Sequence, residues 1–186
     1  MSADDIRQIA GHKIRVLFDE QAIKARVEAI AAEIASDDLE RLLVVPILKG
    51  SFIFAADLLR ALHHQGMTLE VDFMMLSSYG KGTASSGEVR ILRDVETSVK
   101  DRAVVLIDDI LESGRTLAFA KDLIAARGAS AVKTCVFLDK PANRAVGLDA
   151  DYAGVSCPDL FVVGYGMDMG HAFRELPFVG VVETED

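Results

Sequence analysis

The segment that most constrains how this chain can fold runs from Val104 to Thr116 and reads V-V-L-I-D-D-I-L-E-S-G-R-T. Apolar residues lead into two adjacent carboxylates, Asp108 and Asp109, and a Ser-Gly-Arg-Thr turn then opens a segment with helical spacing of apolar residues. The pattern predicts a buried strand, a turn and a helix. Acidic side chains at the carboxyl end of a strand suit sugar hydroxyls, and the free N–H groups at a helix start suit a phosphate. One short segment therefore offers sites for both ends of a ribose 5-phosphate.

The remaining apolar residues alternate between helical spacing and strand-like runs. We expect a helix from Asp19 to Ser36, with Asp19 as its N-cap, and a second helix after the Lys49-Gly50-Ser51 turn. Further strands are expected within Arg41–Leu48, Leu69–Leu76, Val89–Leu92 and Ala131–Leu138. Strands that alternate with helices in this way predict an α/β fold, in which a parallel sheet is flanked by helices on both faces.

The chain changes character at about residue 141. From there it holds short strand-like pieces, Phe161–Gly164 and Val179–Val182, but no segment with strong helical spacing. We expect a single domain over 1–186, with a core at about 19–140 and a small hood lobe formed by 141–186 and the N-terminal segment. The lobe should lie over the carboxyl edge of the sheet, where open α/β sheets bind ligands. Residues 79–87, rich in Gly, Ser and Thr, are expected to form a flexible closing loop.

Composition excludes several classes of protein. Half of the chain (51%) is hydrophobic, which excludes a disordered protein. The 20 basic and 29 acidic residues give a net charge of −9, which argues against a nucleic-acid partner bound through a basic face. The two cysteines lack metal-ligand spacing and lie in apolar surroundings, so we expect two buried thiols. No run has the length of a membrane span or the form of a signal peptide, so we expect a cytoplasmic protein without a membrane partner.

The segment Val104–Thr116 resembles the phosphoribosyl-pyrophosphate (PRPP) signature of the type I phosphoribosyltransferase family. Further pieces resemble its hypoxanthine/guanine branch, in the same order and at similar spacing from about residue 40 onward. They are L-K-G-S at Leu48–Ser51, S-S-Y-G at Ser77–Gly80, L-D-K-P at Leu138–Pro141, P-D-L-F-V-V-G-Y-G-M-D at Pro158–Asp168 and F-R-E-L-P at Phe173–Pro177. The resemblance implies a purine salvage enzyme that transfers the 5-phosphoribosyl group of PRPP to N9 of a 6-oxopurine. It also implies Mg²⁺ as cofactor and a homodimer or homotetramer.

The resemblance assigns the opening segment to the ribose phosphate. Asp108 and Asp109 would accept hydrogen bonds from the ribose 2- and 3-hydroxyls, directly or through the metal; the alternative is that they only cap a turn. The 5-phosphate is expected at Ser113, Gly114, Arg115 and Thr116. The alternative for this turn is an ordinary helix start with Ser113 as N-cap.

Glu112 departs from the family pattern, which the resemblance gives as an aspartate. That aspartate acts as general base on the N7 proton of the purine while N9 attacks C1 of the ribose. Glutamate has the same acid chemistry with one more methylene group, which changes the reach of the carboxylate by about 1 Å. We expect Glu112 to serve as the base; the alternative is a solvated acid without a chemical role.

Lys140 is expected to read the purine. It would donate to the exocyclic O6 and so select 6-oxopurines, since the 6-amino group of adenine is itself a donor. Phe161 would stack on the base, and the backbone of Val162 would read its edge. Hypoxanthine is the first expected substrate and guanine the second; xanthine is less favoured because its 2-oxo group reverses the hydrogen-bond demand.

The remaining assignments concern pyrophosphate. Lys49 and Gly50 should lie under it, after a peptide bond that can be cis in this family, and Arg174 would grip it bidentately. Asp168, together with Asp108 and Asp109, would hold Mg²⁺ on the pyrophosphate. Ser78 and Tyr79 begin the loop that would close over the reacting centre and exclude water.

Three other functions stay open at this point. A phosphoribosyltransferase for another base would keep the PRPP segment but should lack the pairing of Lys140 with Phe161. A non-catalytic regulator could use the fold to sense PRPP while it binds RNA or DNA, although the net charge argues against it. A dinucleotide-binding protein is disfavoured, because no G-x-G-x-x-G follows a predicted strand.

Overall fold

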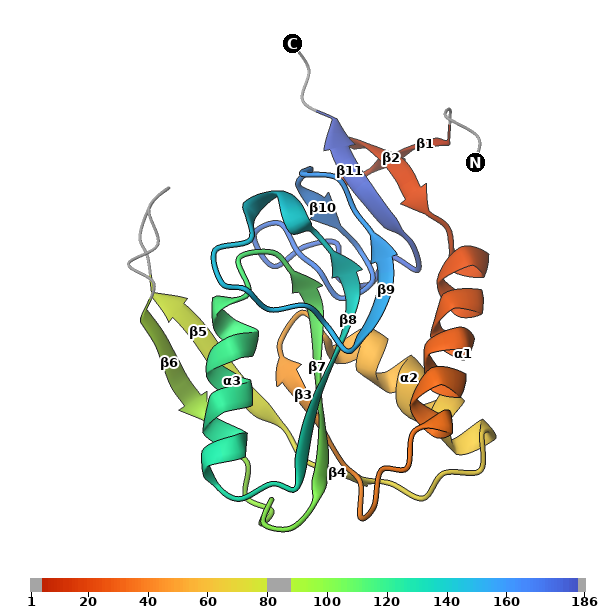
Figure 1. Cartoon of the computed structure of the whole chain (residues 1–186). Helices are drawn as coiled ribbons and strands as arrows, with labels where there is room; N and C mark the ends of the chain where they lie inside the picture. Colours follow the sequence, from red (N-terminus) through yellow and green to blue (C-terminus); the bar gives the residue numbers. More distant parts are fainter. Residues whose placement is uncertain (1–4, 80–87, 184–186) are drawn as a thin grey trace.

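The main sheet confirms the α/β expectation. A computed structural model describes residues 5–79 and 88–183, and its larger sheet has the strand order β6-β5-β3-β7-β8-β9, with β4 also paired to β3 (Figure 1). The strands are β3 (Leu43–Leu48), β4 (Glu70–Val71), β5 (Met74–Tyr79), β6 (Glu88–Arg93), β7 (Ala103–Leu111), β8 (Ala131–Asp139) and β9 (Tyr152–Ser156). All pairings are parallel except that of β5 with the edge strand β6.

Helices cover both faces of this sheet, as the alternating pattern predicts. The helices α1 (Glu20–Ser36) and α2 (Phe52–His64) pack on one face, and α3 (Arg115–Ala126) packs on the other (Figure 1). Asp19 caps α1 as predicted, because its carboxylate accepts a hydrogen bond from the Ala22 N–H at 2.8 Å. A short 3₁₀ helix, η1 (Pro141–Asn143), follows β8.

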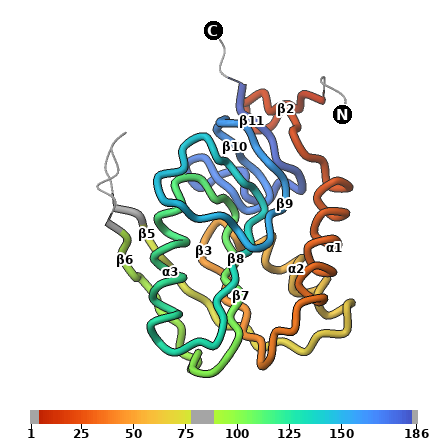
Figure 2. Tube along the Cα trace, viewed as in Figure 1, coloured from red at the N-terminus to blue at the C-terminus, as the bar shows by residue number. Residues whose placement is uncertain are grey.

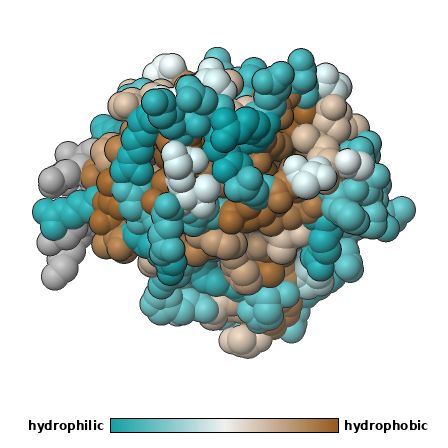
Figure 3. All heavy atoms as spheres, turned by 90° about the horizontal axis from the view of Figure 1, so that it is seen from below, coloured by the Kyte–Doolittle hydropathy of each residue, from teal (hydrophilic) through white to brown (hydrophobic). Residues whose placement is uncertain are grey.

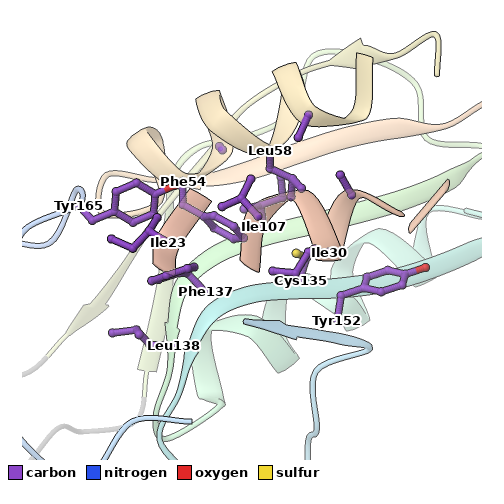
Figure 4. Close-up of a cluster of buried hydrophobic side chains, with 14 of the residues drawn as sticks. Ile23, Ile30, Phe54, Leu58, Ile107, Cys135, Phe137, Leu138, Tyr152 and Tyr165 are labelled. Atoms are coloured by element: carbon purple, nitrogen blue, oxygen red, sulfur yellow. The ribbon is translucent and has the colours of Figure 1, made fainter. Parts of the chain in front are cut away.

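The larger hydrophobic core lies between the sheet and the α1–α2 layer. Phe54 of α2, Phe137 of β8 and Tyr165 gather at one end of it, with ring centroids 5.0 to 6.5 Å apart (Figure 4). The Tyr165 hydroxyl donates to Asp57 Oδ2 at 2.9 Å, which ties the segment after β10 to α2. Both cysteines are buried and free, as predicted.

A second, antiparallel sheet forms the lobe. Its strand order is β1-β2-β11-β10, so the N-terminal hairpin meets the C-terminal strand (Figure 2). The strands are β1 (Ile6–Ile9), β2 (His12–Phe18), β10 (Val162–Val163) and β11 (Val179–Glu183). The lobe has a small core of its own, formed by Ile14, Val163, Phe173, Leu176 and Phe178.

The structure differs from the expected elements in three places. The strand expected at Leu69–Leu76 is interrupted, because the Asp72 carboxylate accepts hydrogen bonds from the N–H groups of Phe73, Glu96 and Thr97. The strand of the opening segment continues through the two aspartates to Leu111, since it pairs with β8 over this length. The region after residue 141 contributes β9 to the main sheet as well as strands to the lobe.

The expected closing loop falls largely on residues 80–87, which lie outside the described residues. Ser78 and Tyr79 form the last backbone pairs of β5 with β6. On the face seen from below, patches of hydrophobic residues lie between hydrophilic ones (Figure 3). Among the described residues, every helix is too short or too polar to cross a bilayer.

Candidate active site

A cleft of about 470 Å³ lies between the carboxyl edge of the main sheet and the lobe. The expected residues that line it are Lys49, Gly50, Asp109, Glu112, Lys140, Phe161, Val162, Asp168 and Arg174. The cleft is also lined by residues that sequence analysis did not single out for this purpose: Leu48, Met75, Leu76, Ser77, Leu92, Ile110 and Met167. The structure thus brings together residues expected to contact base, sugar and pyrophosphate, from segments up to about 125 positions apart in sequence.

Asp108 and Asp109 lie near the end of β7, where only Asp109 lines the cleft. Each accepts the N–H of the next residue: Asp108 Oδ1 from Asp109 and Asp109 Oδ1 from Ile110, both at 3.0 Å. Burial raises the pKa of Asp108 well above 3.8, and the adjacent Asp109 carboxylate raises this pKa further. Burial also raises the pKa of Asp109, although hydrogen bonds and the Arg174 charge oppose the rise. Two crowded carboxylates would gain from a partner that supplies hydroxyl donors or positive charge.

Glu112 and Lys140 meet at the cleft. The Lys140 side chain is buried, and its Nζ lies 3.2 Å from Glu112 Oε1 and 3.9 Å from Asp159 Oδ1. Asn143 of η1 donates to Asp159 at 2.9 Å and more weakly to Glu112 at 3.5 Å. Sequence analysis missed Asn143 and Asp159. In the sequence, Asn143 stands out only as a polar residue close to Lys140, and Asp159 only as one close to Phe161. Glu112 is therefore held beside a buried ammonium group, which argues against a purely solvated acid.

The Lys49-Gly50 turn packs against Asp109. The peptide bond between Leu48 and Lys49 is cis, as the family resemblance allows. A Cβ atom added at Gly50 would lie 1.8 Å from Asp109 Oδ2, and one added at Gly166 would lie 2.1 Å from the Gly50 carbonyl oxygen. Three segments therefore approach so closely here that only glycine fits at both positions.

Asp168 and Arg174 form an ion pair on the lobe side of the cleft. Arg174 Nη2 lies 2.6 Å from Asp168 Oδ1, and Nη1 donates to the Gly166 carbonyl at 2.6 Å. The other Asp168 oxygen accepts the His171 N–H at 2.8 Å. Across the opening, Phe161 is 61% exposed, so its ring is available to a flat ligand, whereas Val162 is buried.

The turn at 113–116 lies next to Glu112 but outside the lining of the cleft. Gly114 occupies the N-cap of α3 with φ of 79° and makes no side-chain cap, so the alternative that Ser113 is the N-cap is wrong. Ser113 Oγ instead accepts the Arg115 N–H at 3.4 Å, and α3 begins at Arg115. The left-handed glycine places a helix start and a hydroxyl side by side, which is a geometry suited to a phosphate.

A magnesium ion can be tested against the side chains of this site. Among the described residues, no group of three or more His, Cys, Asp or Glu side chains is placed to hold a metal. Of the expected ligands, Asp109 and Asp168 line the cleft, and Asp108 precedes Asp109 on β7 without lining it. Mg²⁺ commonly takes one or two carboxylates and completes its shell with water and substrate phosphates, so these residues fit an ion that arrives with its substrate.

Comparison with known proteins identifies the family. The phosphoribosyl transferase domain matches residues 15–169. The chain belongs to this family. It is 43% identical over 180 residues to the hypoxanthine-guanine phosphoribosyltransferase of Aquifex aeolicus, which covers 96% of this chain and 99% of the relative. The fold is similar to that of a hypoxanthine phosphoribosyltransferase from Staphylococcus aureus, with a TM-score of 0.85, 38% identity and 91% of each chain covered.

Other relatives are longer. The chain is 44% identical over 172 residues to the bifunctional protein TilS/HprT of Listeria innocua, which covers 92% of this chain but 26% of that relative. The chain therefore spans about a quarter of the length of such bifunctional relatives. The family that the motifs predicted is confirmed, and the fold class with it.

Proposed function

We propose that this chain is a purine salvage enzyme that transfers the 5-phosphoribosyl group of PRPP to N9 of hypoxanthine, and of guanine as a second substrate. The products would be IMP or GMP and pyrophosphate. The single observation that carries the proposal is the contact of buried Lys140 with Glu112 in a cleft that Asp109 and the exposed ring of Phe161 also line. This arrangement offers a donor for O6, a base for a purine proton and a stacking surface in one cleft.

The purine would bind between Phe161 and the end of β7. The Lys140 ammonium would donate to O6 and stabilise the negative charge that develops as N7 loses its proton. The Glu112 carboxylate would accept that proton, and the N9 lone pair would attack C1 of the ribose. Adenine presents an N–H donor at the same place, which would leave the buried Lys140 facing another donor.

The sugar would lie over the end of β7. As the C1–O bond breaks, the electron pair leaves with pyrophosphate and the ribose gains positive charge, as in glycoside chemistry. Asp108 and Asp109 would hold the 2- and 3-hydroxyls and favour that charge. The turn from Ser113 through Gly114 and Arg115 to Thr116 would hold the 5-phosphate.

Pyrophosphate would leave on the lobe side of the cleft. The Lys49-Gly50 turn and Arg174 supply positive charge and backbone donors there. Mg²⁺, held by Asp168 with Asp108 and Asp109, would neutralise the phosphate charge when it is bound. Ser78 and Tyr79 stand where the closing loop would begin, and closure would keep water from the sugar.

The proposal extends to the state of the protein in the cell. We place it in the cytoplasm, with residues 1–186 forming one domain, with no nucleic-acid or membrane partner, and as a homodimer or homotetramer. The association of copies is what the family resemblance implies. Sedimentation equilibrium decides the oligomeric state, and a purely monomeric protein at micromolar concentration contradicts this part.

The activity is tested with PRPP, Mg²⁺ and each of hypoxanthine, guanine, xanthine and adenine in parallel. Chromatography of the nucleotides and a pyrophosphate assay should both report product with hypoxanthine and guanine, and far less with adenine. Product with a different base alone would move the chain to another branch of the family. Absence of product with all four bases, combined with binding of RNA or DNA at low salt, would favour a regulator.

A further inference from the structure

Arg144 connects the loop that contains Glu112 with the end of β8 and the loop after η1. Its Nε donates to the Glu112 carbonyl at 3.0 Å, and Nη2 donates to the Leu111 carbonyl at 3.4 Å. The same guanidinium contacts the Asp139 carboxylate through Nη2 and the Leu148 carbonyl through Nη1. The side chain is only 14% exposed. One cation thus satisfies acceptors at the end of β7, at the end of β8 and in the loop after η1.

The backbone beside Arg144 continues this connection. The N–H groups of Ala145 and Val146 both donate to the Ser113 carbonyl, at 3.0 and 3.2 Å. A Cβ atom added at Gly114 would lie 3.3 Å from Arg144 Cδ, so the arginine stem also packs against the turn. The segment from Leu111 to Gly114 therefore rests on Arg144 and the two residues after it.

The chemistry of this position requires a guanidinium group. Four acceptors in different directions need several donors in a rigid plane, which arginine has and the single ammonium of lysine lacks. The charge is paired with Asp139, the residue immediately before Lys140. Arg144 therefore contacts the main chain of the proposed base and the neighbour of the proposed purine-reading lysine, but it does not line the cleft itself.

We propose that Arg144 is a positioning residue, which fixes the Glu112 carboxylate and the 5-phosphate turn relative to Lys140. The expected effect on turnover rests on the proposed function. The expected effect on the structure of the turn rests on the contacts described above. Because a shift of about 1 Å can lower a rate by about a hundredfold, loss of these contacts should affect turnover without removing any group that touches substrate.

The test compares Arg144→Gln with Arg26→Gln, a matched control. Arg26 of α1 also donates to two backbone carbonyls, those of Ala153 and Gly154, and contacts the Glu33 carboxylate, but it lies away from the cleft. Both variants lose a partly buried arginine, so both should unfold at a lower temperature. Only Arg144→Gln should lower kcat, by about tenfold or more, and raise the KM for PRPP; Arg26→Gln should stay within about twofold of the parent.

A double-mutant cycle tests whether the effect passes through Glu112. In a Glu112→Gln background, Arg144→Gln should lower kcat by less than about twofold, because the carboxylate that it positions is already absent. An effect of the same size in both backgrounds would overturn the role in positioning the base. A parent-like kcat for Arg144→Gln would overturn it as well.

Hydrogen–deuterium exchange separates this inference from the proposed function. The backbone amides of 111–116 should exchange faster in Arg144→Gln than in the parent. Their exchange rates in Arg26→Gln should equal those of the parent. Unaltered exchange in Arg144→Gln overturns the inference even if the parent makes nucleotide. A parent without activity overturns the proposed function and the kinetic role, whereas the exchange result then stands alone as evidence on how the turn is held.

Discussion

The Nζ atom of Lys140 lies 3.2 Å from Oε1 of Glu112, across 28 positions in the sequence. The Glu112 side chain is one methylene group longer than the aspartate that the resemblance gives for this position. Its carboxylate contacts the buried Lys140 ammonium, which is proposed to read the purine. The Glu112 carbonyl accepts a hydrogen bond from Arg144, and the Glu112 carboxylate contacts both Lys140 and Asn143.

The first prediction concerns the proton acceptor. Glu112→Gln should lower kcat by about 10²- to 10⁴-fold, because an amide cannot accept the N7 proton. The affinity for PRPP, measured by calorimetry with Mg²⁺, should stay within a few-fold. Glu112→Asp restores the family residue and should keep kcat within about tenfold of the parent. A Glu112→Gln variant with unchanged steady-state turnover contradicts the role as base.

The second prediction concerns the choice of base. Lys140→Met should lower kcat/KM for hypoxanthine by about 10²-fold or more, since O6 loses its charged donor. The rate with adenine should fall far less, so the ratio of the two rates moves toward one. Lys133→Met is the control, because Lys133 lies on β8, the strand that ends just before Lys140, but pairs with Asp151. Equal losses with both bases would show that Lys140 does not discriminate between them.

The third prediction uses the close approach at Gly50. Gly50→Ala should abolish most activity, because the new Cβ would overlap the Asp109 carboxylate at 1.8 Å and force one of the two to move. Gly147→Ala is the matched control, since its Cβ would meet nothing within 4 Å. Initial rates at saturating PRPP compare the two variants. Comparable activity in both would mean that the turn can shift at no cost to the reaction.

The fourth prediction links stability to pH. The pKa of Asp108 in the folded chain lies well above 3.8 because of burial and the Asp109 charge, so the folded state keeps its proton to higher pH than the unfolded state. Stability is therefore lost as pH rises from about 4 through the raised pKa, and it stays lower above that pH. Asp108→Asn, which has no such proton, should unfold about 2–4 °C above the parent at neutral pH.

The same variant should separate stability from binding. At a pH well below 3.8 the parent aspartate is protonated in both states, so the difference in melting temperature should vanish. At neutral pH, Asp108→Asn should bind PRPP more weakly despite its greater stability, because an amide is a weaker acceptor than a carboxylate for the ribose hydroxyls and a poorer ligand for Mg²⁺. Thermal melts across pH and calorimetry with PRPP supply both readouts. A variant that melts below the parent at neutral pH contradicts the account.

Sequence periodicity predicted the elements whose neighbours are close in the chain. The Asp19 cap, the two faces of helices and the strand before Asp108 follow from local pattern and turn chemistry. The break at Asp72 was missed because its carboxylate binds N–H groups 24 and 25 positions away. β9 was missed because its five residues, Y-A-G-V-S, carry little strand pattern until β8 offers an edge.

The site was predictable in outline for a different reason. The family motifs predicted which residues meet at the cleft. Of these, Lys49, Asp109, Glu112, Lys140 and Arg174 line it. Motifs did not reveal Arg144, because its partners are main-chain carbonyls 32 and 33 positions earlier. A contact with a carbonyl depends on where the backbone runs, and any residue type can supply that acceptor, so no side-chain pattern marks it.

The pairing of β2 with β11 determines when the sheet of the lobe can form during synthesis. The side chains of Arg15 and Glu183 form an ion pair across these strands, diagonally in the register, and are 168 positions apart. On the ribosome β2 is made long before β11, so its edge stays unpaired until residues 179–183 have followed. The lobe is therefore completed only after the strands of the main sheet, and a chain that stops before β11 can carry a folded main sheet while the sheet of the lobe lacks its central pairing.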